Sequence, residues 1–166
     1  MLGNWRDKMN KKEIALLKSL DPCARALTWM HTQASFREAW DTCQRSDWML
    51  WALRKIEFKD DRKMRLFACQ CIRRTPLVDG RTVWDLLTDG RSRNAIEVAE
   101  KFARGEATAE ELAAAYATDA AASAVHAAYD AAAYAAQANL LREWISWDEV
   151  EAAITAYQDK NNAKKA

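Results

Sequence analysis

The chain has 166 residues, half of them apolar, and its 25 Lys and Arg residues nearly balance 24 Asp and Glu residues. This length and composition favour one globular domain with a hydrophobic core. The apolar runs are too short and too often broken by charges for a membrane span or a signal peptide, and four cysteines are too few for the disulfide framework of a small secreted protein. We therefore expect a soluble, cytoplasmic protein with reduced thiols.

Helix-start and helix-stop signals divide the chain into a series of predicted helices, with no competing strand pattern. The start signals are the capping-box pairs Ser35 and Glu38, Thr108 and Glu111, and Ser146 and Glu149, together with Asp21 before Pro22. The stop signals are Pro76, Gly80, Gly90 and Gly105. The predicted helices cover residues 9–19, 22–32, 36–44, 47–57, 61–74, 81–88, 92–104, 109–142 and 147–159. The prediction is an all-α, single-domain helical bundle over residues 1–159, with a frayed C-terminal tail at 160–166.

The Ala-rich segment 109–142 is predicted to be one long helix packed among the shorter ones, because alanine is the best helix former. At about 100° per residue, its larger and polar side chains gather in one sector of roughly 80°. Five of them are candidate partner-binding residues: Tyr116, Asp119, His126, Asp130 and Tyr134. This polar stripe is open to three interpretations: a solvated outer face, a contact for a partner protein, or a metal or catalytic site.

Catalytic chemistry has little support in the sequence. Asp119 and Asp130 are about 16 Å apart along a helix, too far to act on one bond. Cys69 and Cys71 would point about 200° apart on one helix, so they cannot bind the same metal. Gly-rich phosphate loops, HExxH patterns and nucleophile elbows are absent from the sequence. We expect no catalytic residues, no metal site and no cofactor, and therefore not an enzyme.

Eight tryptophans are an unusually large number for this length. In SDWMLWALRKI, Trp48 and Trp51 are surrounded by other apolar residues, which favours a position in the core. The alternative is that some tryptophans are exposed anchors for a partner, since Trp, Tyr and Arg dominate interface hot spots.

Charge is unevenly distributed along the chain. Residues 1–93 carry 19 Lys and Arg against 12 Asp and Glu (19 − 12 = +7), and residues 94–166 carry 6 against 12 (6 − 12 = −6). We interpret this chiefly as attraction between parts of one folded chain. The alternative is a nucleic-acid-binding accessory protein that uses the basic region 54–74, where the cations are Arg54, Lys55, Lys59, Arg62, Lys63, Arg65, Arg73 and Arg74. Three acidic residues in the same region weaken this alternative.

Four segments resemble a known family: FREAWDTCQRSDWMLWAL, RKMRLFACQCIRR, GRSRNAIEVAEKFARGEATAEELAAA and LLREWISWDEVEAAI. They are similar to a family of small Ala-rich helical proteins from phages and bacteria, whose members are described as uncharacterised or as immunity proteins. The resemblance implies a protein of a bacterial cell that neutralises another protein, either a toxin or, in a phage, a host defence effector. We therefore expect a non-enzymatic inhibitor of immunity or anti-defence type, for example an anti-CRISPR protein, that acts by stoichiometric binding.

Overall fold

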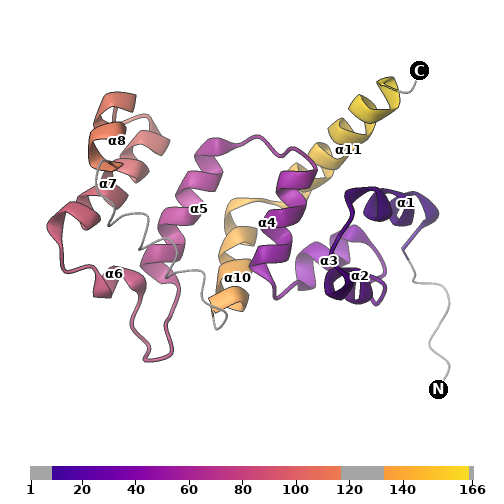
Figure 1. The fold of residues 1–166 in the computed structure, drawn as a ribbon, viewed down its shortest axis with the longest axis horizontal. Helices are drawn as coiled ribbons and strands as arrows, with labels where there is room; N and C mark the ends of the chain where they lie inside the picture. Colours follow the sequence, from indigo (N-terminus) through magenta and orange to yellow (C-terminus); the bar gives the residue numbers. More distant parts are fainter. Residues whose placement is uncertain (1–8, 117–132, 165–166) are drawn as a thin grey trace. The chain divides into compact units, whose positions relative to one another are not determined.

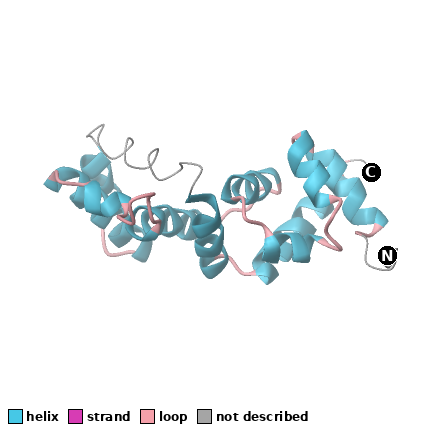
Figure 2. Ribbon diagram, turned by 90° about the horizontal axis from the view of Figure 1, so that it is seen from below, coloured by secondary structure: helices cyan, strands magenta, loops and turns pink. Residues whose placement is uncertain are grey.

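The computed structural model describes residues 9–116 and 133–164, and these residues form helices joined by short loops (Figure 1). The described residues contain ten helices and no strand, apart from one isolated bridge between Pro76 and Thr82. Figure 2 shows the same helical character from a second direction. The all-α prediction is confirmed.

The chain divides into two compact units. Unit 1 combines Met1–Phe58 with Ser146–Ala166, and unit 2 is Lys59–Ile145. The helices of unit 1 are α1 (Lys11–Leu20), α2 (Ala24–Met30), α3 (Phe36–Thr42), α4 (Ser46–Lys55) and α11 (Trp147–Ala163). Those of unit 2 are α5 (Asp61–Arg74), α6 (Val83–Leu86), α7 (Gly90–Arg104), α8 (Ala109–Tyr116) and α10 (Tyr134–Trp144). Whether residues 1–159 act as one domain stays a prediction.

Side-chain caps define the helix ends of unit 1. The Asn10 side chain accepts hydrogen bonds from the N–H groups of Lys12 and Glu13, and Glu13 accepts one from the N–H of Asn10. The other carboxylate oxygen of Glu13 accepts from the N–H of Phe36 at 2.9 Å. One carboxylate therefore caps α1 and also holds the start of α3 against it.

In unit 2, α5 packs against α6, α7 and α10. The core contains Cys69 and Ile72 of α5 with Val83, Ile96 and Ala99 from the helices that cover it. Next to this core, the guanidinium of Arg73 donates two hydrogen bonds, of 2.6 and 2.9 Å, to the carboxylate of Glu100 on α7. The Glu100 side chain is only 8% exposed, so this ion pair fixes the register of α5 against α7 in a largely desolvated position.

Several predicted helix boundaries differ from the structure for local reasons. Asp21 ends α1 in a left-handed conformation rather than starting the next helix, and α2 begins at Ala24. Gly90 begins α7, because the side chain of Asp89 caps that helix. The last helix runs to Ala163, into the segment predicted as a frayed tail, and Lys160 forms an ion pair there with Glu57.

The long helix predicted over 109–142 can be compared only at its two ends. Residues Ala109–Tyr116 and Tyr134–Trp144 are helical, with α10 starting at Tyr134, and residues 117–132 lie outside the described residues. The capping box predicted at Thr108 and Glu111 is present at the start of α8. A single continuous helix between these ends stays a prediction.

Replacing Glu100 with Gln should lower the free energy of unfolding by about 2–3 kcal/mol, because Arg73 loses the anionic partner of a largely buried, charge-assisted pair. Urea unfolding followed by circular dichroism measures this change. Glu143→Gln is the matched control, since Glu143 pairs with Arg74 on the exposed surface and its loss should leave stability nearly unchanged. Equal effects of the two substitutions would contradict a structural role for the buried pair.

Candidate functional site

Unit 1 contains an apolar cavity of about 110 Å³ at the centre of its five helices. Each of α1, α2, α3, α4 and α11 contributes to its walls. The tryptophans in the walls are Trp29, Trp40, Trp48, Trp51 and Trp147. Aliphatic and sulfur side chains complete a lining that is almost entirely apolar. We refer to this space as the tryptophan cavity.

The tryptophans of the cavity differ in exposure. Trp40 is only 7% exposed, whereas Trp29, Trp48, Trp51 and Trp147 are half-buried. The rings of Trp29 and Trp48 are in contact, with centroids 5.9 Å apart and planes inclined by 50°. This tilted arrangement is favourable for an aromatic pair and fixes both rings in place. The cavity wall is therefore a preformed aromatic surface.

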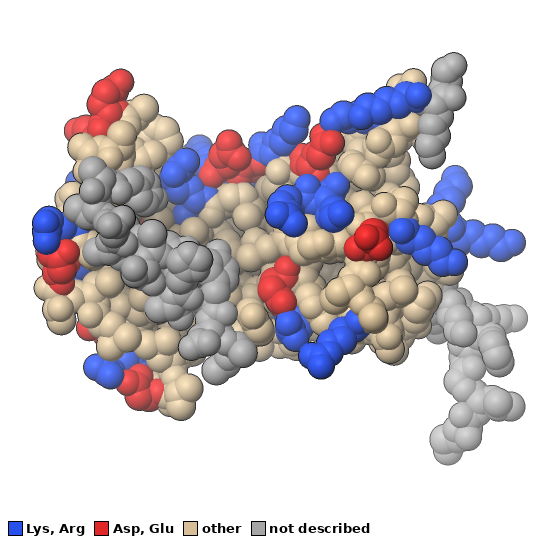
Figure 3. Space-filling view, in the orientation of Figure 1, with Lys and Arg blue, Asp and Glu red and all other residues tan. Residues whose placement is uncertain are grey.

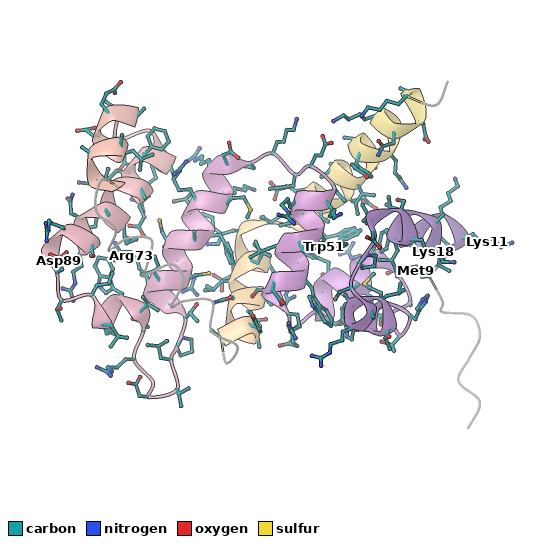
Figure 4. The ribbon with its side chains drawn as sticks, viewed as in Figure 1. Met9, Lys11, Lys18, Trp51, Arg73 and Asp89 are labelled. Carbon is teal, nitrogen blue, oxygen red and sulfur yellow. The ribbon has the colours of Figure 1, made fainter. Side chains whose placement is uncertain are left out.

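Two cations lie against these rings. The guanidinium of Arg45 lies 4.9 Å from the centroid of Trp48, and the ammonium of Lys55 lies 5.6 Å from that of Trp51. Figure 4 labels Trp51 on α4. Arg45 also donates hydrogen bonds to both carboxylate oxygens of Asp47, at 2.8 and 2.7 Å, and this pairing lowers the pKa of Asp47. Positive charge is thus placed directly beside an apolar recess.

The size of the cavity limits what it can hold. Pockets for drug-sized ligands and cofactors are usually about 300–1,000 Å³, much larger than this one. An apolar cavity of about 150 Å³ accommodates benzene, so this space matches one bulky apolar side chain. Burying one bulky apolar side chain there would contribute about 1.5–3 kcal/mol to binding.

The structure describes only two of the five candidate residues of the predicted polar stripe. Asp119, His126 and Asp130 lie outside the described residues. Tyr116 is the last residue of α8, and Tyr134 is the first residue of α10 and is half-buried. The stripe as a partner-binding surface therefore stays a prediction.

The structure separates the cations of the basic region. Arg54 and Lys55 belong to unit 1, and the other six belong to unit 2. Arg73 is bound to Glu100 and stacks on Trp84, with its guanidinium 3.9 Å from the ring centroid, and Arg74 is bound to Glu143. These carboxylates come from the acidic part of the sequence, which agrees with attraction between parts of the folded chain. Figure 3 shows positive and negative side chains interspersed on the face that it draws.

Arg62 and Arg65 differ from the other cations of α5. Neither forms an ion pair with a carboxylate among the residues that the structure describes. Both line a second pocket, which also includes Arg104 and Phe102 of α7. Sequence reasoning missed Arg104 and Phe102 because they lie about 40 residues away along the chain, and only the packing of α5 on α7 brings them to this position.

The described residues contain no group of three or more His, Cys, Asp or Glu side chains placed to hold a metal ion. Among the same residues, no helix is both long and apolar enough to cross a membrane. The comparisons with known proteins found no matching family model, no matching curated protein and no matching solved structure. The two pockets are therefore the candidate binding sites among the described residues.

The cysteines should differ sharply in reactivity. Burial raises the pKa of Cys69 to about 11 and that of Cys71 to about 12, and Cys43 is also buried, whereas Cys23 is exposed. At pH 8, Ellman's reagent should therefore react rapidly with one thiol of the native protein and with all four after unfolding. Cys23→Ser should abolish the rapid phase; a rapid phase that persists in this variant would contradict the assignment.

The same pKa values predict a loss of stability at high pH. In the unfolded chain these thiols ionise near pH 9, whereas in the folded chain they stay protonated to about pH 11 or 12. Their favourable contribution is complete below pH 9 and is lost as the pH rises through the folded-state pKa values. In urea unfolding measured between pH 7 and 11, the midpoint of the wild-type protein should fall above pH 9. Relative to each protein's own midpoint at pH 7, the fall should be smaller in Cys69→Ala.

Proposed function

We propose that this chain is a non-enzymatic binding protein that captures another protein stoichiometrically, with a bulky apolar side chain of the partner entering the tryptophan cavity. The observation that carries the proposal is the apolar, tryptophan-walled cavity in unit 1. Tryptophan-rich recesses are typical of interface hot spots, where one anchor residue is fully desolvated. The resemblance seen in the sequence further suggests an inhibitor of immunity or anti-defence type, whose partner is a toxin or a host defence effector.

The charges beside the cavity define the expected chemistry of the partner. Arg45 and Lys55 lie on the faces of Trp48 and Trp51, so an approaching segment meets positive charge around an apolar recess. Asp47 neutralises part of the charge of Arg45, whereas no ion pair joins Lys55 to a described carboxylate. The best match is a polypeptide segment with one large apolar residue and at least one acidic residue near it.

Filling the cavity accounts for only part of the affinity. A contribution of about 1.5–3 kcal/mol corresponds to a factor of about 12 to 140 in Kd, since each 1.4 kcal/mol is about tenfold. A stable inhibitor complex needs about 12 kcal/mol for nanomolar affinity, so a wider contact surface must surround the anchor.

Ala39→Leu should fill the cavity from α3 and abolish anchor binding without unfolding the protein. Ala39 lines the cavity and is 5% exposed, so the added methyl groups enter the empty space rather than solvent. The melting temperature should stay unchanged or rise, while the affinity for the partner should fall by at least about tenfold. Ala15→Leu is the matched control, because Ala15 is an exposed residue of α1.

The measurement has two stages. Immobilised wild-type chain is used to capture the partner from the native host lysate, and the purified pair is then examined by light scattering and calorimetry, with a fixed stoichiometry expected. If Ala39→Leu binds as well as Ala15→Leu does, the cavity is not the anchor site. If His126→Ala loses binding and Ala39→Leu does not, the partner binds the polar stripe instead. If no protein is captured at all, the whole proposal is contradicted.

A further inference from the structure

The second pocket, of about 350 Å³, lies in unit 2 between the first turn of α5 and the last turn of α7. Three arginines line it: Arg62 and Arg65, one helical turn apart on α5, and Arg104 on α7. Asp61 is the one carboxylate in the lining. The formal charge of the lining is therefore 3 − 1 = +2. We refer to this space as the arginine pocket.

Among the described residues, the arginines of the arginine pocket lack the close carboxylate partners that the arginines at the other end of α5 have. Arg73 and Arg74 each bind a carboxylate through two hydrogen bonds. By contrast, Arg104 has only a long contact of 3.9 Å to Glu100, whose carboxylate already accepts both hydrogen bonds from Arg73. An anion in the pocket would therefore meet three guanidinium groups with most of their donors available.

The pocket is also preformed. The guanidinium of Arg65 lies 5.1 Å from the centroid of the Phe102 ring, which restricts the side chain of Arg65 before any ligand binds. The N-terminus of α5 is already capped by the carboxylate of Asp60, which accepts a hydrogen bond from the N–H of Lys63, so the arginines rather than the helix dipole supply the positive potential. At the C-terminus of α7, the carbonyls of Lys101 and Phe102 accept hydrogen bonds from Glu106 and Gly105, which reduces the opposing negative potential there.

We propose that the arginine pocket binds a phosphate group. A phosphate dianion matches the formal charge of +2, and its oxygens can accept paired hydrogen bonds from guanidinium groups. The volume is near the lower limit for small-ligand pockets, about 300 Å³, which suits a small phosphorylated compound or one nucleotide of a single strand. The site is independent of the protein-binding function proposed for unit 1.

Two probes distinguish the sources of the phosphate. The full-length chain is titrated with pyrophosphate and, separately, with a short single-stranded DNA at low ionic strength, with binding followed by calorimetry and by NMR of the arginine Nε–H groups. Arg65→Gln and Arg104→Gln should each weaken binding by about tenfold, since a charge-assisted hydrogen bond is lost. Arg65→Lys retains the charge but not the planar fork, so its affinity should be intermediate.

Arg91→Gln is the matched control, because Arg91 is an exposed residue at the opposite end of α7 and should not affect binding. Pyrophosphate binding that is sensitive to Arg65 and Arg104 but not to Arg91 supports a site for a free phosphorylated ligand. DNA binding with the same pattern supports the same site, occupied by a backbone phosphate. Absence of binding by both probes, or equal weakening by all glutamine variants, would overturn the proposal. Since Ala39→Leu lies in unit 1, it should leave probe binding unchanged.

Discussion

The structure of unit 1 depends on the burial of apolar side chains that are carried by short helices. The helices α1 to α4 have ten, seven, seven and ten residues. Isolated helices shorter than about 12–15 residues are marginal in water, so these segments are helical because they share one apolar centre and because side chains such as Asn10 cap their ends. The tryptophan cavity lies at that centre, and residues of all five helices form its walls.

Unit 2 relies on a different interaction. Glu100 lies almost fully buried on α7 and receives Arg73 from α5, which in turn stacks on the ring of Trp84. This arrangement has an effect one turn further along α7. Glu100 is already occupied by Arg73, so it offers Arg104 only a long contact, and Arg104 remains beside Arg62 and Arg65 with surplus positive charge. The buried ion pair therefore helps both to set the packing of α5 on α7 and to leave the arginine pocket positively charged.

Local signals in the sequence were sufficient for much of the fold. Helix α5 was predicted at its observed limits, and the capping boxes at Thr108 and Ser146 are present as expected. The errors occurred where one residue took an unexpected role at a helix end: Asp21 ends α1 through its left-handed backbone, and the side chain of Asp89 caps the start of α7. Both outcomes are set at a single residue, which composition and periodicity do not specify.

The candidate sites were harder to predict, for a physical reason. The number of tryptophans indicated a core or an interface, but whether packing leaves a space among them depends on the relative positions of five helices. Likewise, eight cations in one region left nucleic-acid binding open as an alternative, and folding pairs two of them with distant carboxylates and joins two others to Arg104. Both sites are thus properties of tertiary packing rather than of any one segment.

The two pockets should respond oppositely to salt, and this difference separates their roles. An apolar anchor in the tryptophan cavity is held chiefly by the hydrophobic effect, which salt leaves intact or strengthens. An anion in the arginine pocket is held by charges near solvent, which are screened within about 8–10 Å at physiological ionic strength. Binding of an apolar anchor in the tryptophan cavity would therefore persist in concentrated salt, apart from the contribution of an acidic residue near Arg45 and Lys55, whereas phosphate binding in the arginine pocket would weaken. The salt dependence measured for each binding reaction consequently reports which of the two chemistries holds its ligand.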